Sequence, residues 1–169
     1  MNSADLLRDH FDRITEIVND AVEGLTPEQL SYRPDADANS IAWLVWHLTR
    51  VQDDHVADVA GIDQVWTSEG WARRFDLPFD DAAHGYGQSS EDVAKVKVES
   101  GDLLTGYLDA VTAQTKKYVA TLTDKDLDRV VDTRWDPPVT LGVRLVSVIG
   151  DDLQHAGQAS YIRGLIERL

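Results

Sequence analysis

Apolar residues recur every three or four positions along four long stretches of the chain, which is the spacing of one face of an α-helix. The stretches run over residues 3–24, 40–59, 89–122 and 140–169, and we expect a kink in the third near Ser100-Gly101. Four helices of this length, each with an apolar face to bury, favour a helical bundle. The sequence therefore predicts an all-α fold, a four-helix bundle.

The segments between these helices contain one short turn, one long connection and one extended piece. Thr26, with Pro27 after it and Gln29 three positions on, has the residue order of a helix start and predicts a single short turn. The connection from Gly61 to Ser89 shows no sustained period, and its aromatic residues argue against disorder. We expect it to be a long crossover between the second and third helices, able to lie over one end of the bundle. Residues 130–135 are predicted to be extended.

Glycine interrupts the last predicted helix at positions 142, 150, 157 and 164. Each glycine destabilises a helix by about 1 kcal/mol relative to alanine, so this number of them calls for a reason. Gly150, Gly157 and Gly164 are spaced by seven residues and therefore share one stripe of the helix. We interpret the stripe as a place where a neighbouring helix approaches closely.

Composition limits the classes of function. A chain of 169 residues with 43% hydrophobic content is expected to form one domain over residues 1–169. Sixteen basic against 30 acidic residues give a net charge of −14, which disfavours nucleic acid and anionic membranes as partners. The chain has no cysteine, no visible signal peptide and no apolar run of membrane-spanning length, so we expect a cytoplasmic protein without a cysteine nucleophile. The apolar faces of a bundle are compatible with a homodimer.

Three residues on the two most apolar helices have the chemistry of metal ligands. Asp151 and His155 are four residues apart and lie on one helix face, and His47 lies in the apolar first half of the second helix. Alone, a histidine in such a place is more often a hydrogen-bonded core residue, and an Asp–His pair is more often an ion pair. Together they favour a metal site, because an ion would offset the cost of burying them. Two imidazoles and one carboxylate suit Zn²⁺ first, and also Fe²⁺, Ni²⁺ or Mn²⁺, with positions left open.

Other polar residues are predicted to surround these ligands. Gln158 shares the face of His155 and is expected to act as a hydrogen-bonding neighbour of the ligands. Arg50 and Asp54 share the face of His47 and are candidates for lining a pocket. Asp54 is two turns from His47, about 10 Å along the axis, and so cannot bind the same ion. No Ser-His-Asp arrangement or phosphate-binding glycine loop is present, and His10, His55 and His84 lack a suitably spaced or oriented partner.

Several segments resemble a known family. Four long helices, Trp46-His47-Leu48 early in the second, the long crossover, and Asp151, His155 and Gln158 in the last helix resemble the DinB-like metal-binding bundle superfamily over essentially the whole chain. The sequence of residues 40–48, the region 71–81, and His155 with its Ala-Gly-Gln continuation most resemble its S-transferase-like group. Many members of that superfamily use three histidines, and here Asp151 replaces the first histidine of the pair. A carboxylate at that position resembles the mycothiol-dependent branch, which includes maleylpyruvate isomerase and the mycothiol S-transferases. The chain has no counterpart of the isomerases' additional C-terminal domain, so S-transfer is the favoured expectation.

The resemblance implies a metal-dependent thiol S-transferase. His47, Asp151 and His155 would hold a divalent ion that activates a low-molecular-weight thiol, expected to be mycothiol with bacillithiol as the alternative, for conjugation to electrophiles in detoxification. Arg50, Trp71 and the crossover would shape the thiol or electrophile site. Two alternatives stay open: a hydrolase that uses a metal-bound water with Asp54 as base, and a non-catalytic metal-binding bundle related to stress.

Overall fold

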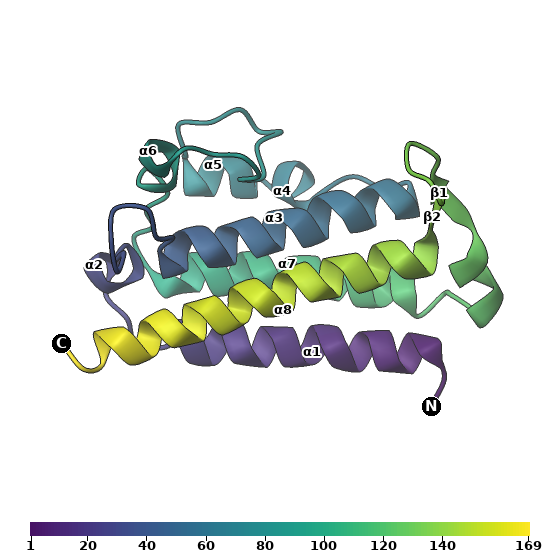
Figure 1. Ribbon diagram of the computed structural model, residues 1–169, viewed down its shortest axis with the longest axis horizontal. Helices are drawn as coiled ribbons and strands as arrows, with labels where there is room; N and C mark the ends of the chain where they lie inside the picture. The colour runs from purple at the N-terminus through teal and green to yellow at the C-terminus, as the bar shows by residue number, and fades with distance from the viewer.

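The structure is a computed structural model that describes residues 1–169, and it is helical except for one small hairpin (Figure 1). The elements are α1 (Ser3–Val22), α2 (Pro27–Leu30), α3 (Ile41–Ala60), α4 (Val65–Ser68), α5 (Trp71–Phe75), α6 (Ser90–Val93), α7 (Gly101–Val119), the 3₁₀ helix η1 (Asp124–Asp128), β1 (Val130–Asp132), β2 (Val139–Thr140) and α8 (Leu141–Ile166). The predicted all-α bundle of four long helices is confirmed. No helix is both long enough and apolar enough to cross a membrane.

The order of the long helices explains why the crossover is long. Helix α8 packs against α1 and α3, and α7 packs against the other sides of the same two helices. Helices α3 and α7 run in one direction and α1 and α8 in the other (Figure 1). The connection from α3 to α7 must therefore return along the whole bundle, and α4, α5 and α6 lie on this return path.

The apolar pattern of each helix determines how deeply it is buried. Every residue from Ile41 to Arg50 is buried, as expected for a segment that is apolar nearly all round. Helix α1 buries only one stripe, which includes Phe11, Ile14 and Val18. The core of the bundle therefore lies against the first half of α3, and polar residues in that half are held in an apolar environment.

Polar side chains cap the longest helices and the predicted short turn. Ser40 Oγ accepts a hydrogen bond from the Trp43 backbone N–H at 3.1 Å, and Thr26 caps α2 in the same way, as its residue order predicts. In the first helix, which begins at Ser3, the N-cap is Asn2. Asn2 Oδ1 accepts from the Asp5 N–H at 2.8 Å, and the Asp5 carboxylate accepts from the Asn2 N–H at 3.1 Å. This reciprocal pair satisfies two backbone donors, which a serine one position later would not do.

The predicted third helix, residues 89–122, is in fact two helices. Helix α6 ends at Val93 and α7 begins at Gly101, so the expected kink is a break of seven residues. Val96 and Val98 are buried while the lysines beside them are exposed, which is the alternation of an extended segment. Gly101 permits the break to close against α1, since a Cβ there would lie 2.4 Å from Val22 Cγ1.

The glycine stripe of α8 does not contact another helix. A Cβ added at Gly150 or Gly157 would meet nothing within 4 Å, and one at Gly164 would meet only the end of Arg168. The prediction of a close helix–helix approach at this stripe is therefore wrong for the single chain. The stripe lies on the outer side of α8, which neither α1 nor α3 covers.

The crossover is fixed to α3 by a buried carboxylate. Asp53 accepts hydrogen bonds from the backbone N–H groups of Val65 at 2.9 Å and Trp66 at 2.8 Å, and from the Tyr107 hydroxyl at 2.8 Å. These bonds satisfy free N–H donors at the start of α4 and join it to α7. The crossover shows no sustained period in the sequence, and the structure gives the reason, because its helices α4 and α5 are too short to show one.

Candidate metal centre

The fold brings together the three predicted metal ligands from two helices. His47 lies on α3, and Asp151 and His155 lie one turn apart on the adjacent α8. One ligand atom from each residue lies within 4.8 Å of the other two, and His155 Nε2 is 3.7 Å from Asp151 Oδ1. An ion with bonds of about 2.1 Å needs only small side-chain rotations to contact all three. The triad can therefore hold one metal ion.

Hydrogen bonds orient both imidazoles toward a common point. His47 Nδ1 is bonded to the backbone carbonyl oxygen of His84, so this nitrogen carries the proton and donates it. His155 Nδ1 lies 2.9 Å from Gln158 Oε1, and it donates to that amide oxygen. Both histidines therefore keep Nε2 as a free lone pair, which is the arrangement found in metal-binding histidines. Gln158 lies on the same face of α8 as His155, as its spacing in the sequence predicts.

The indole of Trp43 covers the imidazoles on one side. Its ring stacks on His47 with centroids 4.5 Å apart and lies edge-on to His155 at 6.1 Å. Burial lowers the pKa of His47 below its ordinary value, although the hydrogen bond to His84 acts in the opposite direction. His47 is therefore neutral at pH 7, which is the form that binds metal.

The carboxyl groups at the site complete a donor set that fits a divalent cation. Asp151 Oδ2 is buried and has no hydrogen-bond partner, which is costly for a carboxylate unless a cation contacts it. The next residue, Asp152, is fully buried with both oxygens unpaired, and burial raises its pKa well above the ordinary value. Burial therefore favours the protonated, uncharged form of Asp152. Two imidazoles and one carboxylate suit Zn²⁺, Fe²⁺, Ni²⁺ or Mn²⁺.

A cavity of about 670 Å³ reaches two of the three triad residues, His47 and Asp151. His47 and Asp151 line its inner end, and His84 lies beside them on the crossover. Asp54 lines the cavity farther along α3, in agreement with the sequence-based expectation. A ligand held at the triad can therefore extend into a space of the size that small-molecule sites commonly have.

Two residues expected to bind substrate lie elsewhere. Arg50 is fully buried, and its guanidinium donates to the Ala83 carbonyl at 3.1 Å and to Gln64 Oε1 at 2.7 Å. Trp71 is buried in α5, where its ring packs on Tyr107 at 5.6 Å. Neither lines the cavity at the triad. Arg50 is turned about 60° around α3 from His47 and faces the crossover, so its hydrogen bonds hold that segment in place. Trp71 helps to hold the crossover by packing on Tyr107 of α7.

Two histidines that the sequence did not single out also line the cavity. His84 supplies the carbonyl that fixes His47, and His55 Nδ1 lies 2.8 Å from Arg144 Nη1. His55 was expected to point away from the face of His47, but the cavity is wide enough to include it. Gly85 was the sequence signal for the position of His84, since a glycine in a long crossover indicates that the backbone there approaches another part of the chain closely.

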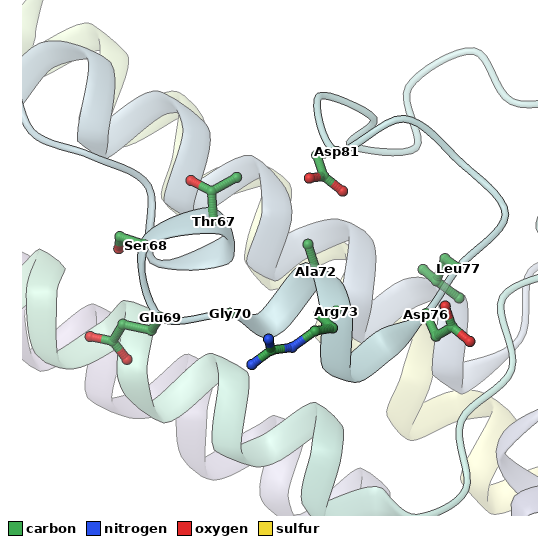
Figure 2. A pocket seen from close by; sticks show the side chains of 9 residues that line it. All are labelled: Thr67, Ser68, Glu69, Gly70, Ala72, Arg73, Asp76, Leu77 and Asp81. Atoms are coloured by element: carbon green, nitrogen blue, oxygen red, sulfur yellow. The ribbon is translucent and has the colours of Figure 1, made fainter.

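A second hollow, of about 630 Å³, lies on the outer side of the crossover (Figure 2). Its labelled side chains include Glu69, Arg73, Asp76 and Asp81, and none is an imidazole. It shares no lining residue with the cavity at the triad. The group of histidine and acidic side chains close enough to share one ion is the triad, and none of its members lines this second hollow.

The hydrogen bond between His155 and Gln158 gives a first testable prediction. Replacing Gln158 with Leu removes the acceptor that holds the proton on Nδ1, and we expect zinc to bind about tenfold more weakly. A competition titration against a chromophoric chelator measures this change. Gln154→Leu is the matched control, because Gln154 bonds only to the Gly150 carbonyl of its own helix. Equal zinc affinity in both variants would contradict the role given to Gln158.

Comparison with known proteins identifies a family that matches this chain. A family model described as Mycothiol-S-transferase matches residues 6–168. A solved structure, described as the conserved protein of locus from Enterococcus faecalis, is 34% identical and superposes with a TM-score of 0.93. That match covers 100% of this chain and 99% of the other. The search of curated proteins returned no match.

Proposed function

The chain belongs to the mycothiol-S-transferase family, a DinB-like family, and on this premise we propose that it is a divalent-metal-dependent thiol S-transferase. Its reaction would join mycothiol to electrophilic small molecules. The observation that supports this most directly is the triad of His47, Asp151 and His155 at the inner end of a ligand-sized cavity. The sequence-based assignment to this family is confirmed by the match over residues 6–168.

The residues of the site have different roles in binding a cation and a thiol. A bound divalent ion, Zn²⁺ in the first place, would lower the pKa of a coordinated thiol from about 8.5 so that the thiolate forms at neutral pH. The His84 carbonyl and Gln158 keep the two Nε2 lone pairs directed at one point. Asp151 supplies the single negative charge of the donor set, which leaves net positive charge to stabilise a thiolate.

The nucleophile must come from outside the chain, because the protein contains no cysteine. In the proposed reaction the sulfur of the thiol forms a bond to an electrophilic carbon while the bond from that carbon to its leaving group breaks. The leaving group departs with the bonding electron pair, as bromide from monobromobimane or chloride from chlorodinitrobenzene, and the thiol proton is released to solvent. The cavity of about 670 Å³ provides room for both reactants beside the triad. The role of the protein is to bind, orient and ionise the thiol next to the electrophile.

Thiol consumption tests this proposal. Metal-loaded protein is expected to consume mycothiol with monobromobimane or chlorodinitrobenzene faster than the spontaneous reaction, and removal of the metal by a chelator should return the rate to the spontaneous value. Bacillithiol and glutathione serve as comparison thiols. Metal-dependent ester hydrolysis without thiol consumption would instead support the hydrolase, with Asp54 as its base. Tightly bound metal with neither activity would support a non-catalytic bundle.

A further inference from the structure

A short part of the crossover, residues 80–84, lies between the two hollows, and we call it the wall segment. Its Asp81 lines the outer hollow (Figure 2), and its His84 lines the cavity at the triad. The same segment carries the His84 carbonyl that accepts the hydrogen bond from His47 Nδ1. The path of the wall segment therefore determines where the His47 imidazole finds its acceptor.

Two side chains reach the wall segment with hydrogen bonds from other parts of the chain. One is His47 itself, and the other is Arg50. Arg50 Nε donates to the Ala83 carbonyl oxygen at 3.1 Å, and Arg50 Nη2 donates to the Asp81 carbonyl oxygen at 3.3 Å. The remaining hydrogen bonds of the segment join near neighbours in the sequence. Apart from the metal ligand, one guanidinium thus supplies the hydrogen bonds that fix this segment to the bundle.

The guanidinium of Arg50 is itself held on every side. The side chain is fully buried, Nη1 donates to Gln64 Oε1 at 2.7 Å, and the same nitrogen lies 3.8 Å from the carboxylate of Asp53. Its Cζ lies 5.0 Å from the centre of the Trp66 ring. A guanidinium is a planar fork of donors in fixed directions, which an ammonium group is not. Arg50 therefore sets the direction of both carbonyls that it binds.

The bond to Ala83 acts on the carbonyl that precedes the acceptor of His47. Because peptide bonds are planar, only the φ and ψ angles of His84 separate the Ala83 carbonyl from the His84 carbonyl. We propose that Arg50 is a positioning residue of the metal centre. By fixing the Ala83 carbonyl it directs the His84 carbonyl at Nδ1 of His47, which keeps the proton on Nδ1 and leaves Nε2 free for the ion. This inference rests on the proposed function, since it concerns the metal centre of the same site.

The tautomer of His47 in the protein without metal tests the proposal. In histidine-labelled protein, ¹⁵N NMR distinguishes a protonated from an unprotonated ring nitrogen, and the His47 signals are those absent from His47→Gln. The unmodified protein is expected to show the Nδ1–H tautomer alone. Arg50→Lys keeps the buried positive charge, but an ammonium cannot bind both carbonyls in the geometry of the fork. We expect a mixture of tautomers in this variant and about tenfold weaker zinc binding in a competition titration.

Asp53→Asn is the matched control for a general loosening of the crossover. Asp53 is buried beside Arg50, but it holds the start of α4 through Val65 and Trp66 and makes no hydrogen bond to the wall segment. This variant is expected to lose stability and to keep both the single His47 tautomer and the zinc affinity of the unmodified protein. Equal changes in Arg50→Lys and Asp53→Asn would overturn the proposal.

A double variant avoids leaving one buried charge without its partner. Arg50→Met combined with Asp53→Asn removes both charges, and replacing both members of a buried ion pair is often neutral for stability. It differs from Asp53→Asn only at position 50, so it decides the question where Arg50→Lys does not fold. We expect the mixed tautomer and about tenfold weaker zinc binding. An unchanged tautomer and unchanged zinc affinity would overturn the proposal. The expected changes, together with no thiol transfer by the unmodified protein, would overturn only the proposed function.

Discussion

Single replacement of His47, Asp151 or His155 by alanine is expected to lower zinc affinity by at least about a hundredfold and to abolish metal-dependent thiol consumption. Each variant removes one of three donors, and the two that remain cannot enclose the ion. Elemental analysis of freshly purified protein, followed by competition titration, measures the loss. His10→Ala is the control, because His10 is an exposed imidazole on α1. Unchanged metal content in all three variants would exclude the triad as the metal site.

Thermal unfolding separates loss of metal from loss of fold. An ion at 100 times its dissociation constant stabilises the native state by about 2.7 kcal/mol, so zinc should raise the Tm of the unmodified protein and of the His10 control. The triad variants are expected to unfold cooperatively without this response. Asp151→His is a useful addition, since an imidazole there keeps three donors and should restore the zinc-dependent rise in Tm. No rise for Asp151→His would show that the site requires a carboxylate.

The ligands were predictable because two of them carry a local signal. Asp151 and His155 are one turn apart, and their helical spacing alone puts them on one face. His47 has no local partner, but its position in a fully apolar segment made an unpaired imidazole unfavourable, and the family resemblance connected it with the other two. Gln158 followed from the same helical geometry. Local spacing, the cost of burial and the family resemblance together were therefore sufficient to predict the inner end of the site.

The outer end of the site depends on segments whose paths have no local signal. His84 reaches His47 because the crossover returns along α3, and Asp132 reaches Arg144 because β1 pairs antiparallel with β2, with Val130 opposite Thr140. Residues 130–135 were predicted to be extended, but a strand of two residues is too short to be recognised as their partner. Long-range pairing of this kind is fixed by tertiary packing and is not encoded in residue spacing.

The same distinction applies to helix boundaries and faces. Thr26 was identified as the start of a short helical turn because capping is decided within four residues. The break before Gly101 was expected only as a kink, although the alternating Val96 and Val98 carried a period-two signal of an extended segment. The glycine stripe of α8 was wrongly predicted to contact a neighbouring helix. The sequence shows that this helix face carries no side chains at the glycines, but it does not show which neighbour, if any, covers the face.

Gly85→Ala is expected to disrupt the metal site without touching any ligand. Gly85 has a φ of +97°, and a Cβ there would lie 2.7 Å from His47 Nδ1 and 3.1 Å from atoms of both Trp43 and Trp46. All three are buried rings that cannot move aside easily. The crossover would have to withdraw, and the His84 carbonyl would withdraw with it. We expect a loss of about 2–4 kcal/mol in unfolding free energy and at least about tenfold weaker zinc binding.

Gly87→Ala is the control that distinguishes the steric clash of a Cβ at position 85 from the backbone strain of alanine at positive φ. Gly87 also has a positive φ, +75°, but a Cβ there would meet nothing within 4 Å. This variant therefore carries the conformational cost of alanine at positive φ, about 1 kcal/mol, and should bind zinc with unchanged affinity. Denaturant unfolding and chelator competition measure the two quantities on both variants. Equal zinc affinity in the Gly85 and Gly87 variants would show that contact between the crossover and His47 does not hold the imidazole in its metal-binding orientation.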